Sequence, residues 1–120
     1  MRMQARREIV MVDLIGELDT VMSQMVDREL RVLAGDPARG ATIVIRLEGL
    51  DSTQWAGLCD LAAVVEKHRR EGLDVRAHSR LQRVRAVLDE FAIPCDVPAP
   101  EGTVRRRRII IARTPKPHVA

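Results

Sequence analysis

The sequence of 120 residues predicts a small α/β domain with a mostly parallel sheet. Apolar, β-branched runs alternate with segments whose apolar residues recur every three or four positions. The chain holds one Trp, one Phe and no Tyr, so its core has to be built from aliphatic side chains, which suits strands covered by helices. The order strand, helix, strand, helix, strand, helix implies crossover connections between parallel strands.

The first predicted pair is a strand over residues 8–15 and a helix over residues 20–34. The strand, EIVMVDLI, is almost entirely apolar. The sequence GELD, Gly16–Asp19, is expected to turn the chain, and Asp19 or Thr20 can cap the helix. A Gly-Asp-Pro sequence then ends the helix.

The second pair is a strand over residues 41–47 and a helix over residues 54–70. The strand, ATIVIRL, is apolar and β-branched along its length, as expected for a central strand covered on both faces. Charged residues dominate the end of the helix, so we expect His68 to be solvated there. Gly72 ends the helix.

The third pair is a strand over residues 73–78 and a helix that Ser79 is expected to cap. The apolar stripe of this helix consists of Leu81, Val84, Val87, Leu88 and Phe91. Pro94 stops the helix, and residues 95–97 can form a brief edge strand.

Residues 1–100 are predicted to form a single domain, and residues 101–120 a basic C-terminal extension. The extension carries six of the 20 Lys and Arg residues and one carboxylate, so the body is slightly acidic and offers no broad surface for nucleic acid. Residues 104–112, VRRRRIIIA, are strand-like. Either a partner or this segment is expected to pair beside the first strand. Residues beyond Thr114 are expected to form a flexible tail.

Several classes of protein are disfavoured by what the sequence lacks. No apolar run approaches the roughly 20 residues that cross a bilayer, and no secretory signal is recognisable, so we expect a cytoplasmic protein without membrane insertion. Cys59 and Cys95 lie far apart and are expected to be reduced thiols. Neither the three histidines nor any motif indicates a metal site, a cofactor or catalytic residues, so we expect no enzyme.

Five short sequences, taken in order, resemble the STAS domains, a family that includes the bacterial anti-sigma factor antagonists. They are GELD at 16–19, VIRLEGL at 44–50, Gly57-Leu58, EGLDV at 71–75 and AHSRLQRVRAVLDEFAI at 77–93. The resemblance runs from about residue 8 to residue 97 and implies a small sheet with helices. Family members normally have a strand before the first one found here, and too few residues precede Glu8 for a full-length one.

In phosphorylatable members a strand leads into an Asp-Ser-Ser-Gly-Leu type of motif, whose second hydroxyl accepts phosphate. Without a gap, Gln54 takes the Asp position, Trp55 the first hydroxyl position and Ala56 the acceptor position. Ala56 has no oxygen to phosphorylate, so the resemblance implies a protein that is not switched at the usual position.

A gapped alignment would place the sequence from Asp51 on the motif and make Ser52 or Thr53 the acceptor. That alignment needs three extra residues ahead of Gly57, and the neighbouring residues already match without a gap. We therefore prefer the ungapped alignment and interpret the two hydroxyls as helix caps.

Trp55 has two interpretations. By family analogy it lies where the protein partner docks, and exposed Trp is a frequent interface anchor. Alternatively it folds back as a lid over the sheet edge in a chain with almost no other aromatic residue. We favour the anchor. The predicted partner-binding residues are Asp19, Asp51, Ser52, Thr53, Gln54, Trp55, Ala56, Gly57 and Leu58.

The resemblance implies a protein-binding regulator that captures an anti-sigma factor and thereby releases the sigma factor. An alternative is a structural subunit of a stress-sensing assembly or of an ABC-type lipid-transport complex. In both cases the partner is a protein. Nucleic acid is not expected, and a homodimer is left open.

Overall fold

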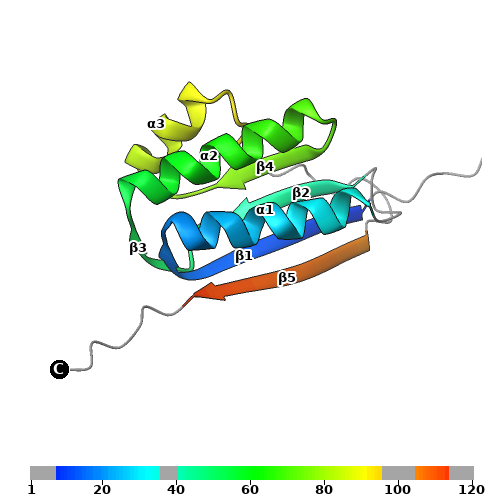
Figure 1. Cartoon of the computed structure of the whole chain (residues 1–120), viewed down its shortest axis with the longest axis horizontal. Helices are drawn as coiled ribbons and strands as arrows, with labels where there is room; N and C mark the ends of the chain where they lie inside the picture. The colour runs from blue at the N-terminus through cyan, green and yellow to red at the C-terminus, as the bar shows by residue number, and fades with distance from the viewer. Residues whose placement is uncertain (1–7, 36–40, 96–104, 114–120) are drawn as a thin grey trace, which may run out of the picture.

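The computed structural model describes residues 8–35, 41–95 and 105–113, which contain five strands and three helices (Figure 1). In chain order the elements are β1 (Glu8–Leu18), α1 (Thr20–Ala34), β2 (Thr42–Arg46), β3 (Leu50–Thr53), α2 (Trp55–Arg70), β4 (Asp74–His78), α3 (Gln82–Glu90) and β5 (Arg105–Arg113). Every strand pairing among these elements is parallel, so the predicted small α/β fold with a mostly parallel sheet is confirmed.

Strand β1 lies inside the sheet and has neighbours on both edges. Along one edge it pairs with β2, which in turn pairs with β4. The other edge is shared, because β5 pairs with Glu8–Gly16 and the short β3 pairs with the last residues, up to Leu18. The end of β1 is therefore the place where β3 and the last residue of β5 meet.

The core lies between the sheet and the helices. Helices α1 and α2 run side by side over one face, and α3 lies beside α2 (Figure 1). Val10, Val12 and Leu14 alternate along β1 and are buried in the core. Ile43, Val44 and Ile45 of β2 are all buried, which confirms the prediction of a central strand covered on both faces.

Strand β1 is three residues longer than predicted. Gly16 has a φ of +104°, and the register with β3 shifts between Gly16 and Glu17, so the chain forms a bulge there and continues to Leu18. A Cβ on Gly16 would lie 1.8 Å from the carbonyl oxygen of Arg113, so glycine allows β5 to approach at this point. The predicted turn over Gly16–Asp19 is therefore wrong.

Strand β5 occupies the edge of β1 that sequence analysis assigned either to a partner or to residues 104–112. Three of its arginines make ion pairs with acidic residues at or next to β1. Arg107 Nε lies 3.3 Å from Glu8, Arg108 Nε 2.5 Å from Asp13, and Arg113 Nε 2.7 Å from Asp19. The linker before β5 and the expected flexible tail lie outside the described residues.

The prediction that His68 is solvated is wrong. Its side chain is 1% exposed, and its Nε2 lies 2.8 Å from Asp27 Oδ1 of α1. Lys67 Nζ donates to the same oxygen at 3.1 Å. His68 therefore links the two long helices, and only its neighbours on α2 face solvent.

Two predictions near α3 also need correction. The helix begins at Gln82 without a side-chain cap, and the hydroxyl of Ser79 instead accepts a hydrogen bond from the backbone N–H of Leu81. Cys95 does not lie in a strand, and residues 96–97 of the expected edge strand lie outside the described residues. Cys59 and Cys95 are free, half-buried thiols.

Candidate functional site

The predicted site begins where β3 leads into α2. Gln54 lies between the two elements, and its backbone N–H donates to the carbonyl oxygen of Leu18 at the end of β1. Its side-chain Nε2 donates to Glu17 Oε1 at 2.6 Å. No side chain caps the first turn of α2, and Ser52 and Thr53 belong to β3. The interpretation of these two hydroxyls as helix caps is therefore wrong.

Gly57 holds the first turn of α2 against the junction of β1 and α1. A Cβ at this position would lie 2.5 Å from the carbonyl oxygen of Leu18 and 2.7 Å from the Cα of Asp19. The Ser23 hydroxyl lies 3.0 Å from the carbonyl oxygen of Gly57 and 3.1 Å from that of Asp19, and can donate to either. Gly57 therefore has a packing role beneath the site.

The Asp19 side chain makes its contacts within the domain. Its side chain caps α1 by accepting from the Met22 N–H at 2.9 Å, and both of its oxygens face Arg113 Nε, at 2.9 and 2.7 Å. Burial alone would raise the pKa of Asp19, but the Met22 N–H and the Arg113 guanidinium outweigh it and hold that pKa below its usual value. Asp19 therefore fastens the end of β5 at the site.

Trp55 is the first residue of α2 and is 68% exposed. The interpretation of Trp55 as a lid over the sheet edge is therefore wrong. Trp55 borders a hollow of about 130 Å³. The hollow is lined by Thr53, Trp55, Leu58, Arg83 and Val84. A partner's side chain could contact the indole and the buried Leu58 in the same place.

The nine predicted residues divide by exposure. Asp51, Ser52, Gln54, Trp55 and Ala56 are exposed, Thr53 and Asp19 are intermediate, and Gly57 and Leu58 are buried. Ser52 faces solvent on β3 and Thr53 borders the hollow. The exposed members surround the start of α2, so they can form one contact surface.

Two residues at the start of α3 were missed by sequence analysis. Arg83 lines the hollow next to Trp55, and Leu81 is 51% exposed although its spacing placed it on the buried stripe. Leu81 is the residue immediately before the helix, so the helical period does not apply to it. The three closely spaced arginines Arg80, Arg83 and Arg85 were the feature of the sequence that could have indicated this region.

Within the described ranges, no cluster of three or more His, Cys, Asp or Glu side chains is arranged to hold a metal ion. None of the described helices is both long enough and apolar enough to span a membrane. Comparison with known proteins finds no match to this chain among protein-family models, curated proteins or solved structures.

Proposed function

We propose that the chain is a cytoplasmic, protein-binding regulatory domain of the STAS type that acts as an anti-sigma factor antagonist. The exposed surface around Trp55 captures an anti-sigma factor. Ala56 supplies no acceptor for phosphate, so capture is constitutive or set by abundance. The chain works by binding rather than by catalysis.

One observation carries this proposal. A chain with a single Trp presents that residue 68% exposed in the first turn of a helix, beside a hollow with a buried apolar floor. An exposed indole contributes little to folding stability but can supply roughly 2 kcal/mol or more when it fills a partner's pocket. The order of the resembling motifs and the parallel α/β fold support the assignment to the STAS type.

The experiment is a pull-down from a lysate of the source organism with wild type, Trp55→Ala and Val32→Ala. Val32 is 64% exposed on α1 and serves as the matched exposed apolar control. We expect an anti-sigma factor to bind wild type and Val32→Ala and to be lost with Trp55→Ala, while all three melt at similar temperatures. Retention of that factor by Trp55→Ala would overturn the assignment of the surface. Recovery of a transporter ATPase instead would identify the structural-subunit alternative.

A further inference from the structure

Helix α3 carries its charges in the order that its dipole disfavours. Arg83 and Arg85 lie in its first turn, where the helix end is positive, and Asp89 and Glu90 lie in its last turn, where it is negative. No acidic residue lies in the first turn and no basic residue in the last. This arrangement weakens a helix of only nine residues. A local arrangement that opposes stability is expected where a functional requirement competes with it.

The arginines at the start of α3 are exposed. The Arg80, Arg83 and Arg85 side chains make no ion pair or hydrogen bond with other described residues. Several other arginines of the described residues are neutralised, as where Asp13 faces both Arg46 and Arg108. Three guanidinium groups within six residues are therefore available to an anionic partner.

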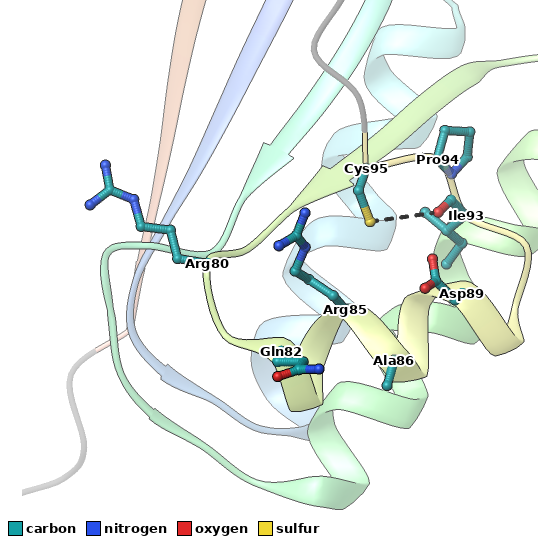
Figure 2. Close-up of a pocket in the computed structure, with 8 residues that line it drawn as sticks. All are labelled: Arg80, Gln82, Arg85, Ala86, Asp89, Ile93, Pro94 and Cys95. Carbon is teal, nitrogen blue, oxygen red and sulfur yellow. Dashed lines mark hydrogen bonds between the residues drawn. The ribbon is translucent and has the colours of Figure 1, made fainter.

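A groove with a volume of about 780 Å³ is lined by residues of α3 other than those beside Trp55, and Figure 2 draws the residues that line it. One wall is a single face of the helix with Gln82, Arg85 and Asp89, and the other includes Pro94 and Cys95. Figure 2 shows the Arg85 side chain extending from the helix toward Cys95. Arg80 and Arg85 both line the groove, so carboxylates that enter it can meet two guanidinium groups.

The other side of the same helical turn combines one arginine with apolar side chains. Arg83 and Val84 line the hollow beside Trp55, and the exposed Leu81 lies just before the helix. A segment that crosses the start of α3 therefore meets arginines on both sides and an exposed apolar surface between them. An acidic protein segment with an apolar side chain has this combination of groups.

Nucleic acid fits this surface less well. Single-stranded nucleic acid is held by successive aromatic rings on which its bases stack, and Trp55 is the one aromatic residue exposed here.

We propose that the start of α3, with the groove behind it and the hollow beside Trp55, binds an acidic, Leu-containing segment of the protein partner. The inference rests on the proposed function, because it specifies the chemistry of the partner that Trp55 anchors. The arginines attract and orient the acidic side chains, and Trp55 and Leu81 contact the apolar one.

The test uses two labelled peptides, one rich in Glu with a single Leu and a counterpart with Gln in place of Glu. Binding to the full chain is measured by fluorescence anisotropy and located by amide chemical shifts in NMR. We expect the Glu peptide to bind, to shift residues 80–86, and to bind about tenfold more weakly to the Arg83→Gln, Arg85→Gln double variant. Arg28→Gln, an exposed change on α1, is the control and should bind as wild type. High salt should weaken binding because it screens exposed charges.

Other results would overturn the inference. Equal binding of the Gln peptide would show that the arginines do not select acidic side chains. Chemical-shift changes on β5, with loss of binding in Arg106→Gln, would move the acidic site to the exposed arginines of that strand. Tighter binding of a poly-dT oligonucleotide at residues 80–86 would indicate nucleic acid. If Trp55→Ala abolishes partner capture while the double variant does not, the proposed function stands and the acidic-segment inference fails.

Discussion

At the scale of single residues, Gly57 and Asp19 show why the start of α2 lies where it does. Gly57 brings the helix backbone against the end of β1, where any side chain would clash with backbone atoms. Asp19 caps α1 and holds Arg113 at the same junction. The sequence predicted the cap from residue type, because Asp before a helix is a local signal. The ion pair with Arg113 joins residues 94 positions apart, and no local pattern could reveal it.

The Asp19 carboxylate is expected to make the stability of the fold depend on pH in the acidic range. Because folding lowers the pKa of Asp19, its contribution to stability is complete above the usual value of 3.8 and is lost as the pH falls through the lowered pKa. Asp19→Asn keeps an oxygen that can cap α1 but removes the charge. We expect Asp19→Asn to unfold at lower temperature at neutral pH and to converge with wild type as the pH falls from about 4 to 2.

Thermal melts followed by circular dichroism across this range provide the measurement. Asp51→Asn is the control, because Asp51 is exposed on β3 and makes no ion pair with described residues. If the difference in melting temperature between wild type and Asp19→Asn stays the same at every pH, the prediction is contradicted.

At the scale of elements, length decided what could be predicted. The long helices and strands have enough periodic positions to be recognised, whereas β3 has four residues and Leu50 is its one apolar side chain. Its strand conformation comes from pairing with the end of β1. His68 was misassigned for a similar reason, since a charged sequence around it conceals the contact with Asp27 on another helix.

Strand β5 is expected to contribute to the core through alternate residues. Ile111 is 7% exposed and belongs to the core, whereas Ile110 is 54% exposed on the opposite face. Ile111→Ala should lower the free energy of unfolding by about 2–4 kcal/mol, because it leaves a cavity. Ile110→Ala removes the same atoms from an exposed position and should cost less than about 1 kcal/mol.

Urea denaturation of the two variants checks this prediction. If both variants lose the same free energy of unfolding, then Ile110 and Ile111 are equally buried in solution, which would contradict the prediction. A larger loss for Ile110→Ala would indicate that β5 pairs with β1 in a register shifted by one residue, because such a shift exchanges the two faces.

At the scale of the whole molecule, the sheet brings the first and last described elements together. The sequence predicted the α/β class and identified residues 104–112 as strand-like, but the parallel pairing of β5 with β1 depends on contacts across most of the chain. The same limit applies to the candidate site. Trp55 was identified because it is unique, whereas its neighbour Arg83 comes from a helix whose position only the assembled fold defines.

Removal of β5 is therefore expected to affect the entire domain. A chain cut after residue 104 loses the buried Ile111 and the ion pairs of Arg108 and Arg113. We expect its melting temperature to fall by roughly 10–20 °C, or its cooperative transition to disappear. A chain cut after Arg113 keeps every contact described here and is the matched control. Equal melting of the two truncated chains in calorimetry would show that β5 adds nothing to stability.

The position of β5 has a consequence for synthesis on the ribosome. Most of the outer edge of β1, which is made before the other described strands, gains its neighbour only when residues 105–113 have emerged. Until then an apolar strand presents unpaired backbone groups, which are a template for association with other chains. The nascent chain should therefore be most vulnerable to aggregation, and most in need of a chaperone, in the interval between completion of α3 and release of the last strand.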